Sequence, residues 1–189
     1  MRYRIDRTPG ILRVPKPIWD AFRSALLTQR PEGAEGLGFF FSKKSCSQCG
    51  PTTYVPTEWV VPARDCYSWQ TAAGLEISQE YHIRLIKKHL LPGLDVVHIH
   101  SHPGSAFPHF SSTDDHYEKR YITFLNRYRP GSRLISGVFD EGINHGRFRL
   151  WCDSESRPTD IDFNTNWFTT KGSEPTNAAP EVQIGRAHV

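Results

Sequence analysis

Residues 94–115 read LDVVHIHSHPGSAFPHFSSTDD, an apolar run that passes directly into closely spaced histidines. Its β-branched beginning predicts a buried strand over 94–100. Residues two apart on a strand point to the same side, so His100 and His102 can offer two imidazole nitrogens to one cation. The chain then turns at Pro103-Gly104 and reaches a Ser-Ser-Thr-Asp-Asp run, which predicts the start of a helix.

Helical and strand patterns alternate on both sides of this stretch. Apolar residues at helical spacing predict helices over 17–29 and 79–91, in addition to the one that starts at 111–115. Short apolar or alternating runs predict further strands, at 11–14, 37–41, 52–62, 133–139 and 147–152. Residues 42–52 are polar and predict a loop. The mixture predicts an α/β (α+β) fold, with a single mixed β-sheet flanked by helices.

The length of 189 residues suits one domain with a substantial core. We expect this domain to span residues 10–152. The segment 153–189 is polar and has no hydrophobic periodicity, so we expect a disordered tail. Its last six residues, IGRAHV, resemble the translation of a sequencing-adapter read-through, and we expect them to be foreign to the protein.

Charge and hydropathy exclude some classes of partner. The formal net charge is only +3 and no Lys/Arg stripe is present, so no nucleic acid is expected. No apolar run has the length of a signal peptide or a membrane span, so we expect a cytoplasmic protein without membrane contact. Four cysteines in a chain of this length predict thiols rather than a disulfide scaffold.

The histidine stretch has a metal interpretation and a structural one. His100, His102 and Asp114 make a set of two imidazoles and one carboxylate, which leaves the fourth tetrahedral position of a Zn²⁺ ion for water. Zinc in such a site lowers the pKa of the water and polarises a carbonyl group. In the structural interpretation, the histidines are half-buried strand residues, and the acids suit the helix N-terminus.

The complete string favours the metal interpretation. HSHP (100–103) followed by SSTD (111–114) resembles the JAMM/MPN+ metalloprotease motif, HxHx7SxxD. Glu35-Gly36-Leu37-Gly38, after the first helix and before an apolar run, resembles the family's ExCG segment, although the cysteine is absent. The resemblance covers roughly residues 10–152 and is closest to bacterial JAB-type, deubiquitinase-like members. It implies the JAMM/MPN (cytidine-deaminase-like) architecture.

The resemblance also implies roles and partners. His100, His102 and Asp114 would bind zinc, Glu35 would be the general acid/base, and Ser111 would donate a hydrogen bond to the developing oxyanion. The implied reaction is hydrolysis of an amide or isopeptide bond at the C-terminus of a ubiquitin-like protein, for deconjugation or maturation. Bacterial members often accompany E1-like and E2-like proteins.

Several positions depart from the family pattern. Eight residues separate His102 from the first serine of the run, one more than usual, so Ser112 with Asp115 also fits SxxD. Glu32 is the alternative base. Three further histidines lie near the motif and are possible substitutes or outer groups: His98, His109 and His116.

Alternatives remain open for the substrate and for a second metal. The same zinc site could release an amino acid or an adduct from a sulfur-carrier protein, or the chain could be a non-catalytic scaffold. Cys46 and Cys49 form a CxxC pair that could bind a structural zinc ion together with Cys66 and Cys152, or could be free loop thiols.

Overall fold

The computed structural model describes residues 10–46, 50–90 and 92–166. Its nine strands within these ranges are β1 (Ile11–Arg13), β2 (Leu37–Ser45), β3 (Thr53–Val60), β4 (Tyr67–Thr71), β5 (Gly74–Ile77), β6 (Asp95–Ser101), β7 (Leu134–Phe139), β8 (Gly146–Trp151) and β9 (Thr159–Asn164). The helices are α1 (Lys16–Gln29), α2 (Gln79–Leu90) and α3 (Ser112–Tyr128). No helix in the described part of the chain is long and apolar enough to cross a membrane.

Seven strands close into a barrel in the order β1-β3-β2-β6-β7-β8-β9, and β4 and β5 form a separate hairpin. Strand β1 closes the barrel because it pairs in parallel with both β3 and β9: Ile11 lies opposite Thr53 on one side and Asp162 on the other. This finding corrects the predicted single mixed β-sheet flanked by helices, and with it the JAMM/MPN (cytidine-deaminase-like) architecture. Closure leaves no unpaired barrel edge.

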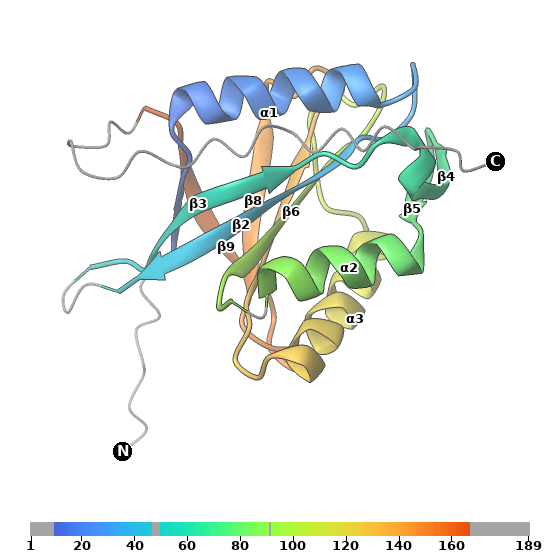
Figure 1. The fold of residues 1–189 in the computed structure, drawn as a ribbon. Coiled ribbons are helices and arrows are strands. Elements are labelled where there is room, and N and C mark those ends of the chain that lie inside the picture. The colour runs from blue at the N-terminus through green and yellow to red at the C-terminus, as the bar shows by residue number, and fades with distance from the viewer. Residues whose placement is uncertain (1–9, 47–49, 91, 167–189) are drawn as a thin grey trace.

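Alternating side chains divide the core into two layers. On β2, Phe40 packs with α1 residues such as Phe22, whereas Phe39 and Phe41 pack with residues of α2 and α3. Helix α1 lies on one side of the barrel, and α2 and α3 lie on the other (Figure 1). The same two-residue period operates on β6, where Val97 joins the α1 layer.

Helix α1 packs closely against the barrel wall. A Cβ atom added to Gly38 of β2 would lie 2.5 Å from the ring of Phe22, so the contact requires glycine at this position. The segment between α1 and β2, which contains Glu35, is thereby held near the end of β6, where the Ser101 N–H donates to the Gly36 carbonyl oxygen.

Several predicted segments differ from the structure. Residues 42–45 continue β2 rather than starting a loop, because they pair with β3 through Ser45 opposite Thr53. The β4–β5 hairpin was not predicted. The expectation of a disordered tail from residue 153 is wrong for β9, which pairs with β8 and β1. Residues 167–189, including IGRAHV, lie outside the described residues.

The role of β9 in closing the barrel can be tested at Ile161, which is buried in the α1 layer. Ile161→Ala should lower the free energy of unfolding by about 2–3 kcal/mol, because it removes buried methyl groups. The neighbouring exposed Asp162→Ala should change it by less than about 0.5 kcal/mol. Urea denaturation measures both, and equal stability of the two variants would place residues 159–164 outside the folded core.

Candidate metal centre

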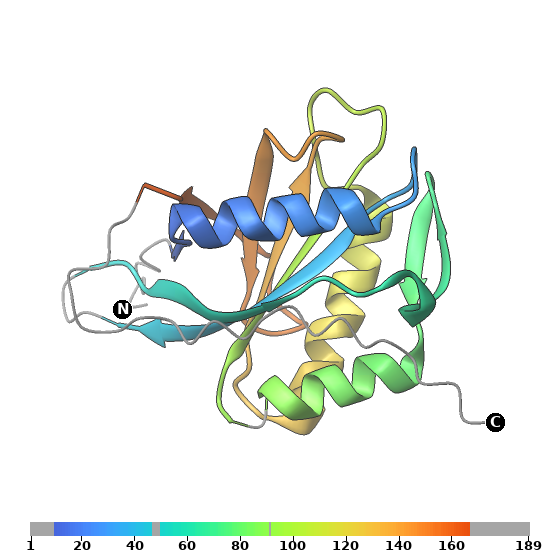
Figure 2. The same cartoon turned by 45° about the horizontal axis from the view of Figure 1, so that its top comes forward.

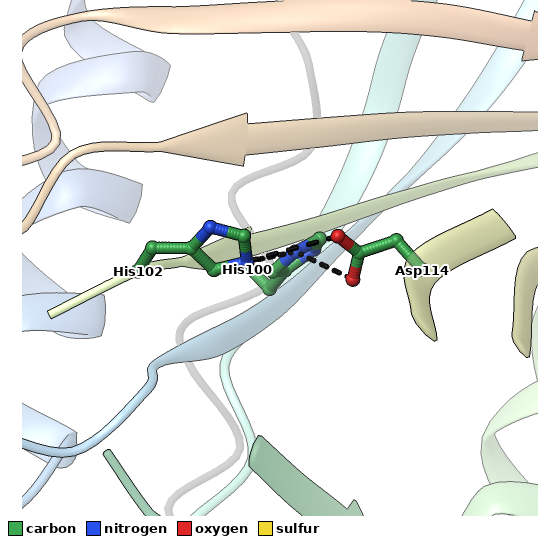
Figure 3. A group of neighbouring side chains, drawn as sticks. All are labelled: His100, His102 and Asp114. Atoms are coloured by element: carbon green, nitrogen blue, oxygen red, sulfur yellow. Dashed lines mark hydrogen bonds and ion pairs between the residues drawn. The ribbon is translucent and has the colours of Figure 1, made fainter. Parts of the chain in front are cut away.

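Three potential metal ligands meet where β6 ends and α3 begins (Figure 3). The Nε2 atoms of His100 and His102 are 3.1 Å apart. Asp114 places Oδ1 at 3.2 Å from His100 Nε2 and Oδ2 at 3.8 Å from His102 Nε2. One ligand atom from each residue lies within 4.8 Å of the other two, so the group could bind a metal ion.

The spacing of these donors fits a small cation. Ligand bonds of about 2.0–2.1 Å in a tetrahedral site place neighbouring donor atoms about 3.3 Å apart. The Nε2–Nε2 distance of 3.1 Å and the Nε2–Oδ1 distance of 3.2 Å are close to this value. These two imidazole nitrogens and the carboxylate could therefore share one metal ion.

Strand β6 and the residue after it orient the two histidines. His100 is the second-last residue of the strand and faces α3, whereas Ser101 faces the α1 side and accepts a hydrogen bond from the Gly36 N–H. His102 follows the strand, but its N–H still donates to the Phe139 carbonyl oxygen of β7. Its imidazole therefore keeps the alignment of the strand and points to the same side as that of His100.

The helix N-terminus orients Asp114. Ser111 is the N-cap of α3, and its hydroxyl accepts from the Asp114 N–H at 3.1 Å. In return, the N–H and the hydroxyl of Ser111 donate to Asp114 Oδ2 at 2.6 and 2.8 Å. This capping box holds Oδ2 and leaves Oδ1 directed at His100. The hydroxyl of Ser111 thus positions a ligand here, and its role as oxyanion donor stays a prediction.

The structure brings Asp114, and not Asp115, to the histidines. The Asp115 carboxylate turns away and accepts a hydrogen bond from Arg149 Nη1 at 2.6 Å. Ser112, the other serine that fits SxxD, is exposed at the first position of α3. Of the two registers open in the sequence, only the one with Asp114 places a carboxylate oxygen beside both imidazoles.

Electrostatics keep these donors available to a cation. Burial opposes ionisation of Asp114, but hydrogen bonds from His100 and Ser111 and the nearby His100 outweigh it and hold the pKa of the carboxyl well below its usual range. Burial, reinforced by His100, lowers the pKa of His102. At neutral pH the carboxylate is therefore ionised and the His102 ring is neutral, which are the forms that bind metals.

Glu35 lies beside this group in the segment before β2. Burial raises its pKa from 4.5 to about 7, with His100 opposing the rise and Asp114 adding to it. The β4–β5 hairpin fixes the Glu35 backbone: its N–H donates to the Thr71 carbonyl, and its carbonyl accepts from Gln70 Nε2. Sequence reasoning missed this hairpin, because its strands carry few apolar residues. Glu32, the alternative base, is exposed.

The remaining histidines of the stretch stay outside the group of three. His98 packs against Phe39 and Tyr121, and burial lowers its pKa to about 3. His109 lies in the loop before α3, with its ring 6.5 Å from that of His102. His116 is exposed on α3. Within residues 10–46, 50–90 and 92–166, no second group of three potential metal ligands was found.

The three cysteines in the described part of the chain do not belong to a group of potential metal ligands. Cys49 lies outside the described residues. Cys46 is exposed, with its Sγ 3.7 Å from the Thr52 hydroxyl, and Cys152 packs against the α1 layer of the core. Cys66 lies beside Asp65. The metal-ligand group found in the described part of the chain contains no cysteine.

Metal binding can be tested by measuring the metal content of purified variants after loading with Zn²⁺. The wild type should bind about one ion per chain, and His100→Ala, His102→Ala and Asp114→Ala should each lose it, because each removes one of three ligands. Asp115→Ala should keep it. Loss in Asp115→Ala together with retention in Asp114→Ala would contradict the register seen in the structure.

The raised pKa of Glu35 predicts a pH dependence of stability in the metal-free protein. The folded state binds this proton more tightly than the unfolded state does, so folding is favoured below pH 4.5 and loses this contribution as the pH rises to about 7. The free energy of unfolding of wild type minus that of Glu35→Gln should therefore fall across this range. The same difference for the exposed Glu32→Gln should stay constant. A flat curve for Glu35 would contradict its perturbed environment.

No model of a known protein family matches this chain. No curated protein matches it either. The resemblance to JAMM/MPN+ metalloproteases therefore rests on the motif residues, and membership of that family is a proposal. The site itself consists of two imidazoles and one carboxylate that could bind a metal ion.

Proposed function

We propose that this protein is a zinc-dependent hydrolase of the JAMM type, which cleaves an amide or isopeptide bond at the C-terminus of a ubiquitin-like protein. The observation that carries the proposal is the convergence of His100, His102 and Asp114 beside a glutamate whose pKa is raised to about 7. A metal site supplies an electrophile, and a carboxylate with that pKa supplies a proton carrier at neutral pH.

The donor set favours zinc over calcium and magnesium. Calcium and magnesium prefer sites made of oxygen atoms, whereas two imidazoles with one carboxylate suit zinc. Three protein ligands leave a coordination position free, as in catalytic rather than structural zinc sites. When bound, zinc would acidify a water molecule and polarise the scissile carbonyl group.

The residues around the site have matching roles. Glu35 takes the proton released when water attacks the carbonyl carbon and delivers it to the leaving amine. Thr71 and Gln70 hold its backbone N–H and carbonyl, and its carboxyl interacts electrostatically with His100 and Asp114. Ser111 orients Asp114 through the capping box. Its hydroxyl is also the proposed hydrogen-bond donor to the oxyanion.

The barrel limits how an extended substrate tail can bind. Peptide tails often add as a strand to an open sheet edge, but every barrel strand already has two neighbours. The β4–β5 hairpin is a separate two-stranded sheet with open edges, and it fixes Glu35. The hairpin and the loop between β6 and α3 lie at the same end of the molecule (Figure 2). We therefore place the tail along this hairpin, with E1-like and E2-like proteins as proposed partners.

The proposal is tested with Glu35→Gln in the zinc-loaded protein. This variant should keep its zinc but lose about 10²- to 10⁴-fold in kcat/KM, because it cannot carry the proton. The assay follows release of an amine from the C-terminus of ubiquitin-like proteins. An amino-acid adduct of a sulfur-carrier protein is tested in parallel as the alternative substrate. Glu32→Gln, in the same segment, is the matched control and should retain activity within about twofold.

Two results would contradict the proposal. Full activity of the Glu35→Gln variant would show that Glu35 does not carry the proton. A zinc-loaded wild type that cleaves none of these substrates would favour the non-catalytic scaffold, and cleavage of the carrier adduct alone would change the substrate class.

A further inference from the structure

We propose that Arg149 is a positioning residue of the metal centre, which holds Asp114 in place through the residues on either side of it. Arg149 lies on β8 and is only 7% exposed. Its hydrogen bonds and ion pairs in the described part of the chain go to Asp115 and Glu118, which are not among the three potential ligands. The inference rests on the proposed metal site, but it concerns how the carboxylate ligand is positioned.

The Arg149 guanidinium makes three contacts with residues at or just before the start of α3. Its Nη1 donates to Asp115 Oδ1 at 2.6 Å, and its Nε donates to Glu118 Oε2 at 2.7 Å. Its Cζ lies 3.7 Å from the centre of the Phe110 ring, a cation–π distance. Trp151 Nε1 also donates to Glu118 Oε2, at 2.6 Å, and so fixes the carboxylate that Arg149 holds.

These contacts surround the ligand segment. Phe110 immediately precedes Ser111, and Asp115 immediately follows Asp114. Ser111 and Asp114 are already joined to each other by the capping box. One buried guanidinium therefore holds both neighbours of a rigid four-residue unit, and this fixes the position of the Asp114 carboxylate relative to the barrel.

The barrel connects this arginine with the histidine ligands. Arg149 of β8 lies opposite Ser136 of β7, and Ser136 lies opposite His98 of β6, two residues before His100. The imidazoles are thus placed by β6 directly, and Asp114 is placed by β8 through Arg149. The histidines and the arginine that holds the Asp114 segment thus lie on three adjacent strands, β6 to β8. The pairing of these strands sets the distance between the imidazoles and the Asp114 carboxylate.

Stability alone gives a poor account of this buried ion pair. Glu118 is 2% exposed, and its Oε1, like Arg149 Nη2, is buried without a hydrogen-bond partner in the described part of the chain. Buried ion pairs with unmet hydrogen bonds often stabilise a protein no more than apolar residues of the same volume. A planar, forked cation does offer directed contacts to two carboxylates and one ring, which suits a positioning role.

The test compares Arg149→Met with Arg147→Met. Arg147 lies on the same strand, but its ion pair with Asp160 is exposed, so it is the matched control. Zinc affinity is measured by competition with a chelating dye. Arg149→Met should bind zinc at least about tenfold more weakly than wild type, as is typical for loss of a group that orients a ligand. Arg147→Met should stay within about twofold.

A second measurement does not need the metal. The Asp114 N–H donates to Ser111 Oγ, so its hydrogen exchange in the metal-free protein reports on the capping box. Exchange should be at least about tenfold faster in Arg149→Met than in Arg147→Met. If wild type binds no zinc, the proposed function fails. The exchange comparison still shows whether Arg149 holds the Ser111–Asp114 capping box in place.

Folding is controlled with two further variants. Arg149→Lys keeps the charge but loses the fork and the planar stack on Phe110, and it should also weaken zinc binding. Arg149→Met/Glu118→Gln removes both buried charges and leaves Trp151 an acceptor, so it should fold even if Arg149→Met does not. Any folded variant without Arg149 that binds zinc within twofold of wild type, with unchanged exchange at Asp114, would overturn the inference.

Discussion

The alternation of side chains along β6 is the constraint on which the rest of the structure depends. This strand lies between β2 and β7, and both of its faces are covered. Val97 and Ile99 fill the layer beneath α1, so His98 and His100 must face α3. A shift of one residue would exchange the two faces, bury imidazoles under α1 and remove the apolar contacts. Packing of the core therefore fixes the direction of the ligands.

Local sequence pattern predicts the central elements but not the closure of the barrel. The apolar run of β6 and the capped start of α3 are visible in the sequence, because burial and capping act on neighbouring residues. Strand β1 has only three residues, and β9 has only Ile161 and Phe163 as apolar side chains. Their pairing joins segments about 150 residues apart, for which local periodicity carries no information. A single mixed sheet flanked by helices was therefore predicted where the chain forms a closed barrel.

The candidate site shows the same limit. Spacing along a strand predicts that His100 and His102 share a direction, and the structure brings them together. Asp114 and Asp115 are equally suited to the first turn of a helix, so composition cannot distinguish them. The two carboxylates differ in the structure because Arg149, 34 residues after Asp115, donates a hydrogen bond to Asp115. Its only sequence signal is a charge within an otherwise apolar strand end, which is too common to identify a partner.

The capping box between Ser111 and Asp114 is formed by two residues of the chain itself, and this has a consequence for any metal ion that the site binds. In small zinc domains the ion organises the chain, and its removal unfolds the protein. Here the hydrophobic layers and the closed barrel organise the chain, so little ordering remains for the ion to induce. An ion bound at this site would then leave and rebind without unfolding the protein, and its occupancy would follow the concentration of free metal.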